Sequence, residues 1–251
     1  MGLIKTKGIV IAIANSSDND KVLTVLTEDL GRISVFCKGA KKNKSALLSV
    51  AEYLAYSEML LYKSPNDNYS LNSAESIELF YNLRMDIEKL NYATVMAKMI
   101  YDSTDENQFT SEILKLFLNS LYVLSNTDKN MDLILSIFEI RLLALLGFTP
   151  RVNSCVNCGE VMKEQMEEFY FSIKDDGVKC EACARQDRGA IKLTKTSFMA
   201  LIYILTAESK KLFSFEVPQE SIDELKLLAQ VYVTEKLERE YRVIKYWHYM
   251  T

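Results

Sequence analysis

The chain has 251 residues, enough for one large domain or for two to three small ones. Apolar residues make up 49% of it, whereas only 3 prolines and 8 glycines interrupt it, so a helix-rich body with real cores is favoured. The formal net charge of −4 argues against indiscriminate binding to polyanions. The sequence has no apolar run of membrane-spanning length and no signal-peptide core near its start, so we expect a soluble, cytoplasmic protein with reduced thiols.

The first 75 residues predict five short strands. Alternating and β-branched patterns place them at residues 3–14, 22–27, 32–38, 53–63 and 69–74, with turn-forming clusters between them. On the third strand, one face carries Ile33, Val35 and Cys37, and the other carries Arg32, Ser34, Phe36 and Lys38. Five strands of this length suit a small closed barrel, because closure removes the edges that invite aggregation. The oligonucleotide-binding (OB) barrel is the most common five-stranded solution.

From about residue 77 the apolar period becomes helical. The first apolar helical face consists approximately of Leu83, Ile87, Leu90, Ala97 and Ile100. Further helices are expected at residues 113–121, 131–148, 195–208 and 219–240. The helix at 131–148 is apolar almost all round, which is typical of a buried central helix, and Gly147 and Pro150 end it. We therefore expect an α+β protein, with a barrel at residues 1–78 and an all-α domain at residues 79–251.

Two Cys-x-x-Cys pairs interrupt the helical part, and they hold four of the five cysteines: Cys155 with Cys158, and Cys180 with Cys183. Each pair forms a tight turn, here called a knuckle, that directs both sulfurs to one point. Four thiolates on two knuckles match the tetrahedral shell of structural Zn²⁺. Two disulfides or free thiols are the alternative. A catalytic zinc keeps an open position and usually includes histidine, but the single histidine is His248. We expect a structural Zn²⁺ that staples an insertion at residues 151–190, with Gly159 and Gly177 at positive φ.

Charge is unevenly distributed along the chain. Residues 1–63 carry a net charge of +3, whereas residues 64–139 carry −7, so a nucleic acid is expected to meet the first module or a local basic patch further along the chain. The loop at residues 38–45 has four lysines and no acid: Lys38, Lys41, Lys42 and Lys44. Such a loop beside a barrel strand suits phosphate oxygens. A solvated loop kept basic for solubility is the alternative.

Two further patterns allow a functional and a structural interpretation. Phe36 between Arg32 and Lys38 resembles an aromatic stacking platform of single-strand binders, although it could also pack under a neighbouring domain. If residues 236–245 are helical, a cationic stripe with a three-residue spacing forms from Lys236, Arg239, Arg242 and Lys245. Interleaved glutamates favour a solvated, paired surface for this stripe.

Motifs of phosphate-binding enzymes, G-x-x-x-x-G-K-[ST] and G-x-G-x-x-G, are absent from the sequence. A Ser-His-Asp or Cys-His arrangement would have to recruit His248, which follows Trp247 near the terminus. The adjacent acidic pairs at residues 167–168 and 175–176 point to different sides and form no acid/base constellation. Nothing in the sequence requires catalysis.

Several runs together resemble the bacterial recombination mediator family RecO. They are KTKGIV at residues 5–10, LTEDLGRISV at 26–35, KGAKK at 38–42, LLYK at 60–63, and FEIRLLALLGFTP at 138–150 leading into Cys155-x-x-Cys158. The resemblance covers essentially the whole chain in one order. It implies an N-terminal OB barrel, a helical C-terminal domain and a zinc-binding insertion.

The resemblance also implies a function and partners. It implies binding to single- and double-stranded DNA, strand annealing, and action with RecR to load RecA onto DNA coated by single-strand-binding protein. The helical domain would receive the acidic C-terminal tail of that coating protein, and the chain would be associated with the nucleoid. The implied DNA face consists of Lys38, Lys41, Lys42 and Lys44, with Arg32 beside them. The competing interpretation is a protein-interaction adaptor that makes little direct DNA contact.

Overall fold

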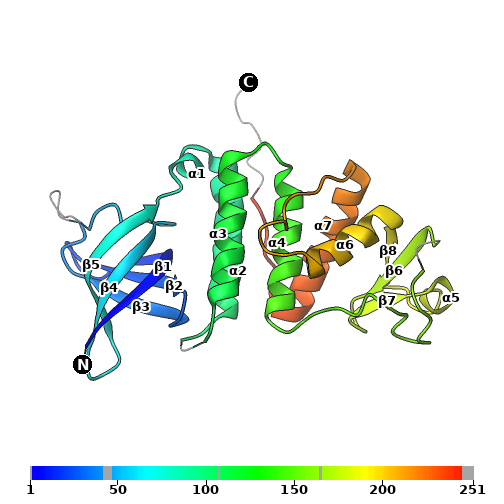
Figure 1. Ribbon diagram of the computed structural model, residues 1–251, viewed down its shortest axis with the longest axis horizontal. Coiled ribbons are helices and arrows are strands. Elements are labelled where there is room, and N and C mark those ends of the chain that lie inside the picture. The colour runs from blue at the N-terminus through cyan, green and yellow to red at the C-terminus, as the bar shows by residue number, and fades with distance from the viewer. Residues whose placement is uncertain (1, 42–46, 107, 164–165, 245–251) are drawn as a thin grey trace. The chain divides into compact units, whose positions relative to one another are not determined.

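The computed structural model describes residues 2–41, 47–106, 108–163 and 166–244 (Figure 1). Lys42 and Lys44 lie outside these described residues. The chain divides into two compact units, Met1–Ser125 and Asn126–Thr251. None of the described helices is both long and apolar enough to cross a membrane.

A closed five-stranded barrel forms the first part of the Met1–Ser125 unit, as predicted. Its strands are β1 (Gly2–Asn15), β2 (Lys21–Thr27), β3 (Arg32–Cys37), β4 (Tyr56–Lys63) and β5 (Tyr69–Glu78), in the order β1-β2-β3-β5-β4. Neighbouring strands are antiparallel except for β3 and β5, and β1 closes the barrel against β4. This order and closure are consistent with the expected OB fold. The inward-facing side chains fill the barrel, because alternate residues of each strand point to one face.

The fourth strand begins later than predicted. Residues 53–55 form a turn, in which Leu54 adopts a left-handed conformation with a φ of 64°. The Leu54 amide donates to the Val10 carbonyl at 2.9 Å, and the Val10 amide donates to the Ala55 carbonyl at 3.1 Å. These long-range hydrogen bonds hold residues 53–55 outside the ladder, which starts at Tyr56.

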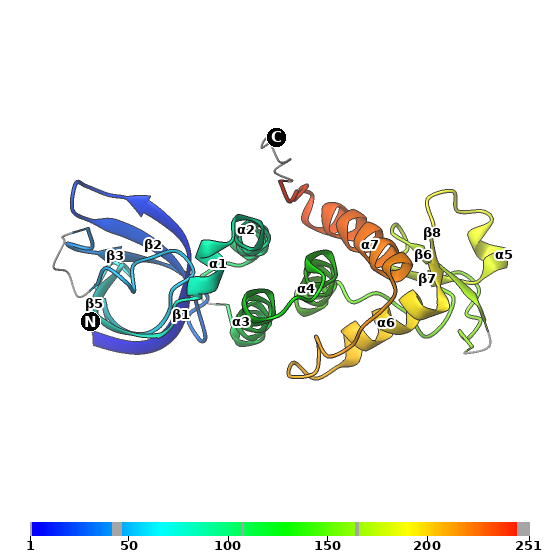
Figure 2. The same ribbon diagram turned by 90° about the horizontal axis from the view of Figure 1, so that it is seen from above.

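Three helices complete the described part of this unit: α1 (Tyr81–Met85), α2 (Ile87–Ser103) and α3 (Ser111–Asn126). The single helical face predicted from Leu83 through Ile100 is wrong, because Asp86 ends α1 and caps α2 with its carboxylate, which accepts from two backbone amides. Ile87 is consequently 60% exposed, whereas Leu83 is buried. Helix α2 lies beside β1 (Figure 2). A buried hydrogen bond from the Thr110 hydroxyl to the Thr27 carbonyl ties the start of α3 to the barrel.

The described part of the Asn126–Thr251 unit contains four helices and a small sheet. Helix α4 (Met131–Leu145) packs against α6 (Lys195–Thr206) and α7 (Gln219–Leu237), and it is buried almost all round, as predicted. The small sheet has the order β7-β6-β8, formed by β7 (Gly177–Lys179), β6 (Glu168–Ser172) and β8 (Ile191–Thr194), and the short helix α5 (Glu181–Ala184) follows β7. Two strands of this sheet, β6 and β7, lie in the segment expected as an insertion at residues 151–190, and β8 lies just beyond it.

Aromatic side chains join this sheet to the helices. The rings of Phe169 on β6 and Phe198 on α6 stack with centroids 3.8 Å apart. Phe171 meets Tyr232 of α7 edge to face at 5.4 Å. All four side chains are nearly or fully buried, so the sheet shares a core with the helices.

The helix on which a cationic stripe at residues 236–245 depends does not continue within the described residues, and the favoured alternative of a paired surface is supported by the ion pair between Arg242 and Glu240 at 2.6 Å. Helix α7 ends at Leu237, and Glu238 takes a left-handed conformation with a φ of 50°, so Arg239 and Arg242 do not continue the helix. The Lys236 amine instead pairs with Asp176 at 2.5 Å, with 15% of its side chain exposed. Lys245 lies outside the described residues.

Candidate metal centre and nucleic-acid face

The four cysteines of the two knuckles converge on one point. Their Sγ atoms all lie within 4.8 Å of one another, and those of Cys158 and Cys180 are 3.7 Å apart. Thiolates at about 2.3 Å from a tetrahedral zinc would lie about 3.8 Å from each other. The predicted grouping is therefore confirmed, and the donor set is compatible with a structural zinc ion.

Backbone hydrogen bonds shape each knuckle. The Cys155 amide donates to the Glu160 carbonyl at 2.7 Å, and the Gly159 amide donates back to the Cys155 carbonyl at 2.9 Å. This reversal places Gly159 at a φ of 78°, as predicted. The second knuckle opens α5, where the Ala184 amide donates to the Cys180 carbonyl at 2.9 Å.

Gly177 is needed for a different reason from the one predicted. Its φ is not positive within the described backbone, but a Cβ placed there would lie 2.4 Å from the Arg151 carbonyl oxygen and 2.6 Å from a methyl group of Val156. The Val178 amide donates to that Arg151 carbonyl, and the Val156 amide donates to the Val178 carbonyl. The glycine thus allows the strand before the second knuckle to lie directly against the first.

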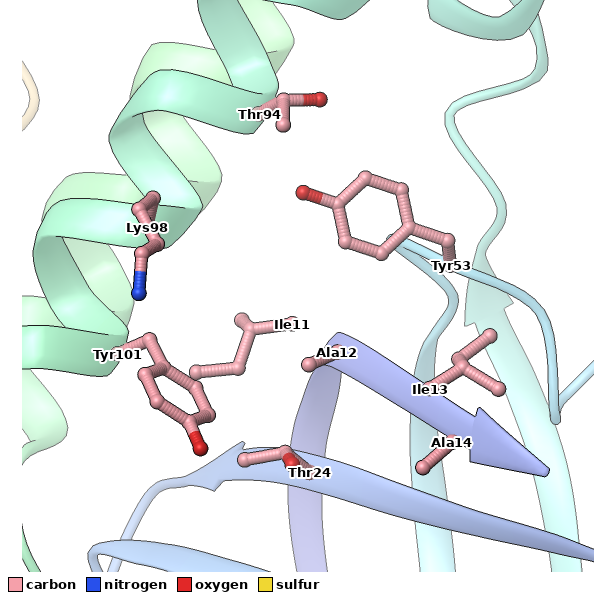
Figure 3. A pocket seen from close by; sticks show the side chains of 9 residues that line it. All are labelled: Ile11, Ala12, Ile13, Ala14, Thr24, Tyr53, Thr94, Lys98 and Tyr101. Atoms are coloured by element: carbon pink, nitrogen blue, oxygen red, sulfur yellow. The ribbon is translucent and has the colours of Figure 1, made fainter. Parts of the chain in front are cut away.

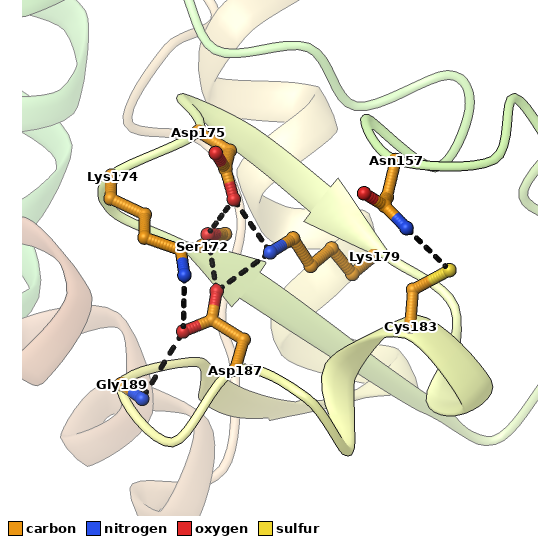
Figure 4. Close-up of polar contacts among 8 residues, drawn as sticks. All are labelled: Asn157, Ser172, Lys174, Asp175, Lys179, Cys183, Asp187 and Gly189. Atoms are coloured by element: carbon orange, nitrogen blue, oxygen red, sulfur yellow. Dashed lines mark hydrogen bonds and ion pairs between the residues drawn. The ribbon is translucent and has the colours of Figure 1, made fainter.

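The environment of Cys155 favours its thiolate. Burial of this side chain opposes ionisation, but hydrogen bonds from the backbone at Cys158, Cys180 and Asn157 outweigh burial and lower its pKa to about 6. The Asn157 side-chain amide also donates to the Cys183 sulfur at 3.3 Å (Figure 4). Thiolates are the form in which cysteines bind metal ions.

A buried ionic network that sequence analysis missed supports the second knuckle. The Lys179 amine contacts Asp187 at 2.8 Å and Asp175 at 2.6 Å, and the Ser172 hydroxyl lies within hydrogen-bonding distance of both carboxylates, at 2.6 Å from Asp187 and 3.0 Å from Asp175 (Figure 4). Hydrogen bonds from Lys179 and Ser172 hold the pKa of Asp187 well below its usual range. Because Lys179 precedes Cys180 directly, the network fixes the strand that delivers this ligand.

The outer face of β3 is formed as predicted. Ile33, Val35 and Cys37 are buried in the barrel core, whereas Phe36 is 38% exposed on the opposite face and Lys38 is exposed just beyond the strand. Gly39 follows at a φ of 68°, and its amide donates to the Asp20 carboxylate at 2.7 Å. The start of the lysine loop is thereby tied to the β1–β2 turn.

The other predicted cations of this face differ in their surroundings. The Lys41 amine donates to the Ser17 carbonyl at 2.9 Å, which holds it over the β1–β2 turn. The Arg32 guanidinium donates to the Thr104 carbonyl at 2.7 Å, pairs with Asp105 at 3.5 Å and lies 4.6 Å from the Tyr101 ring centroid. Arg32 therefore joins β3 to the end of α2, and the contribution of each of these residues to DNA binding stays a prediction.

A pocket of about 640 Å³ lies between β1, β2 and α2, and sequence analysis did not identify it (Figure 3). Thr94, Lys98 and Tyr101 line one side, and their spacing of i, i+4 and i+7 is the signal that a helix-face analysis could have used. The opposite wall is Tyr53, which the late start of β4 leaves in a turn.

Comparison with known proteins agrees with this architecture. The model of the family described as "Recombination protein O N terminal" matches residues 1–80, and that described as "Recombination protein O C terminal" matches residues 84–243. The chain belongs to the RecO family. Among curated RecO proteins, each named "DNA repair protein RecO", that of Acetivibrio thermocellus is 42% identical over 96% of this chain and 94% of its own length.

RecO relatives of lower identity also align over almost the whole of this chain. The protein of Alkaliphilus metalliredigens is 29% identical over 94% of this chain and 95% of its own length. That of Caldicellulosiruptor bescii is 29% identical over the full length of both chains. The N-terminal match thus covers the barrel, and the C-terminal match covers α2, α3 and the cysteine-bearing helical unit.

Proposed function

We propose that this chain is a DNA-binding mediator of recombination and repair; the names of its family and relatives support a role in DNA repair and recombination. It binds single- and double-stranded DNA, anneals complementary strands, and acts without catalytic turnover. With RecR it helps RecA to load onto DNA coated by single-strand-binding protein. The helical unit receives the acidic tail of the coating protein.

The observation that carries this proposal is the outer face of β3. An exposed aromatic ring at Phe36 is followed by the exposed amine of Lys38 and by a lysine-bearing loop, on a barrel whose first 63 residues have a net charge of +3. A base can stack on the ring while lysines neutralise the flanking phosphates, and this combination is typical of single-strand binding. Neutralising phosphates releases counterions, which makes binding salt-dependent.

We further propose that the four cysteines hold one structural Zn²⁺. The closed set of four sulfurs leaves no ligand position for a reactive water, so the ion would stabilise the fold of residues 151–190. A metal that fixes the small sheet would also fix the surface that this segment presents to partners.

A salt titration against a single-stranded oligonucleotide tests the DNA face. We compare the natural protein with a variant in which Lys38, Lys41, Lys42 and Lys44 are changed to Ala. The slope of log affinity against log salt should decrease in magnitude by about 0.7 for each phosphate that the variant no longer neutralises. The matched control changes four exposed lysines elsewhere to Ala, and so has the same net charge: Lys115, Lys163, Lys192 and Lys210.

Equal reductions of affinity in the two variants would show that only net charge matters and would contradict a specific face. A functional assay completes the test: annealing of complementary strands coated with single-strand-binding protein, with and without RecR. We expect the loop variant to be slow in both conditions and the control to resemble the natural protein.

An adaptor function is the second candidate, and the net charge of −7 over residues 64–139 favours it. An adaptor with little direct DNA contact would bind its protein partners equally well after the four loop lysines are removed. It would also support RecA loading at normal rates. Loss of loading in the loop variant, with RecR binding intact, would exclude the adaptor.

A further inference from the structure

The pocket between the barrel and α2 has the shape and lining of a small-ligand site. Residues 11–14 of β1 form its floor, where the ladder with β2 shifts register between Val10 and Ala12. Tyr53 stands on one side and the α2 residues Thr94, Lys98 and Tyr101 stand on the other (Figure 3). A β-bulge bends a strand and re-aims its side chains, which explains how a barrel wall is hollowed at this point.

The lining suits a planar group with apolar faces and polar edges. The floor and the two tyrosine rings supply apolar and aromatic surface, and the hydroxyls of Thr24 and Tyr53 supply hydrogen-bonding groups at the periphery. The Thr94 hydroxyl donates to the Leu90 carbonyl at 2.8 Å, so it faces the pocket as an acceptor. Burial raises the pKa of the Tyr53 phenol, so its hydroxyl keeps its proton and remains a donor at neutral pH.

The cations at this pocket are already paired. The Lys98 amine contacts Asp102 at 2.7 Å, and Arg32, behind Tyr101, pairs with Asp105 at 3.5 Å. With each positive charge matched by a neighbouring carboxylate, the site favours a neutral group over a free phosphate. A nucleobase is neutral and planar with hydrogen-bonding edges, and about 640 Å³ accommodates it.

The pocket continues directly from the outer face of β3. Ala14 of the floor lies opposite Val22 of β2, and Val22 lies opposite Phe36 of β3. Ala12 of the floor likewise lies opposite Thr24 of β2. Adjacent strands are about 4.8 Å apart, so Ala14 and Phe36 are about 10 Å apart across the sheet. A single strand that stacks a base on Phe36 reaches the pocket within a few nucleotides.

We propose that this pocket holds one unstacked base of a single strand of DNA that crosses β3, β2 and β1. This inference rests on the proposed DNA-binding function and adds a site to it. The phosphates of the strand contact the lysine loop, and this part of the affinity depends on salt. The base in the pocket adds a part of the affinity that does not depend on salt and that an abasic strand lacks. The pocket would thereby favour single strands, because a paired base cannot enter it.

Filling the pocket tests the proposal without changing charge. Ala14 is exposed on β1, so Ala14→Trp adds an indole over the floor with little effect on the fold. Asn72→Trp adds the same bulk at an exposed position of β5 outside the pocket and serves as the matched control. Affinities are measured for a single-stranded oligonucleotide and for one of equal length made of abasic residues.

We expect the natural protein and the Asn72→Trp control to prefer the base-bearing oligonucleotide. In Ala14→Trp, affinity for this oligonucleotide should fall by about 10-fold, the contribution typical of one base on aromatic side chains, while affinity for the abasic chain should not change. Thr94→Val and Tyr53→Phe remove hydrogen-bonding groups without filling the pocket, and they should give smaller reductions of the same kind.

An unchanged preference for bases in Ala14→Trp would overturn the pocket proposal. So would a loss of binding to a protein partner by Ala14→Trp with unaltered DNA affinity, because the occupant would then be a side chain of that partner. Failure of the proposed function gives a different result: the natural protein itself would show no salt-dependent binding to either oligonucleotide.

Discussion

The Sγ atoms of Cys158 and Cys180 lie 3.7 Å apart, although 22 positions separate the two residues in the chain. The contact brings the reversal at Gly159 against the strand that ends at Lys179. Four thiols at such distances are a metal-binding arrangement, and a metal would replace weak sulfur contacts with strong bonds. The fold of the segment and the occupancy of the site should therefore be coupled.

Zinc analysis gives the first prediction. The natural protein should contain about one zinc per chain, and the double variant Cys155→Ser, Cys180→Ser should contain none. Loss of the ion should make residues 151–190 sensitive to proteases, since the segment would lose its central cross-link. Zinc content by atomic emission and cleavage sites by mass spectrometry measure the two effects.

Cys37→Ala is the control for this experiment, because the fifth cysteine is buried in the barrel core, away from the four ligands. Its zinc content should remain at that of the natural protein. A full complement of zinc in the double variant would show that the ion is bound elsewhere.

The close approach of backbone at Gly177 gives the second prediction. Gly177→Ala places a Cβ 2.4 Å from the Arg151 carbonyl oxygen, and the two segments must separate to relieve the overlap. We expect the free energy of unfolding to fall by about 1–3 kcal/mol, and zinc affinity to fall with it because Val156 lies in the first knuckle. Urea unfolding and chelator competition measure these two effects.

Gly189→Ala is a matched control within the same segment. A Cβ at Gly189 would meet only the Asp187 carboxylate, at 3.8 Å, and the backbone there has no positive φ. Its unfolding free energy should change by less than about 0.5 kcal/mol. If the two alanine variants behaved alike, the tight packing at Gly177 would have no energetic consequence.

The sequence predicts the barrel and the metal centre well because both depend on local patterns. Alternation along β3 separates Val35 from Phe36 in any sheet with one buried face, and Cys-x-x-Cys fixes the direction of both sulfurs within a single turn. The pairing of β3 with β5 in parallel, by contrast, has no local signal, because a closed barrel with strands in chain order would have the same patterns.

Features that depend on distant partners were not predictable. Leu54 leaves the strand pattern because its amide pairs with Val10, and no local signal marks that bond. Helix α7 ends at Leu237 without a glycine or proline after it. The pairing of Lys179 with Asp187 and the pocket beside Tyr53 likewise exist only once separate elements have come together.

Glu139, buried in the middle of α4, gives the third prediction. Burial, with a contribution from Asp132, raises its pKa to about 8, although Lys226 opposes the change. The folded protein keeps this proton between about pH 4.5 and 8, whereas the unfolded chain has released it. The free energy of unfolding should therefore fall as pH rises through this window.

Glu139→Gln should remove this pH dependence. At pH 7 the variant should be more stable than the natural protein by up to about 3 kcal/mol, and below about pH 4 the two should be equal. Urea unfolding at a series of pH values measures the difference. Glu220→Gln, an exposed position on α7, makes the same charge change and should have no such effect. Parallel pH profiles for the natural protein and Glu139→Gln would show that Glu139 is ionised when folded.

Arg141 of α4 gives the last prediction, because its guanidinium caps the end of α6. One of its nitrogens donates to the carbonyls of Ile204 and Leu205 at 3.2 and 2.6 Å, and the other donates to the Ala207 carbonyl at 3.2 Å. The planar guanidinium group donates to three carbonyls at the C-terminal, negative end of α6 at once. The ammonium group of a lysine does not reproduce this geometry. Arg141→Lys should therefore cost about 1–3 kcal/mol and accelerate hydrogen exchange in the last turn of α6.

Arg185→Lys is the matched control, since Arg185 is 76% exposed and pairs only with Glu181 one turn away on the described surface. Surface pairs of this kind contribute little, so its unfolding free energy should change by less than about 0.5 kcal/mol. Amide exchange followed by mass spectrometry resolves the two variants: protection should fall at residues 203–207 in Arg141→Lys and remain unchanged in Arg185→Lys. Equal protection in both would mean that charge alone, and not the fork, holds α6 against α4.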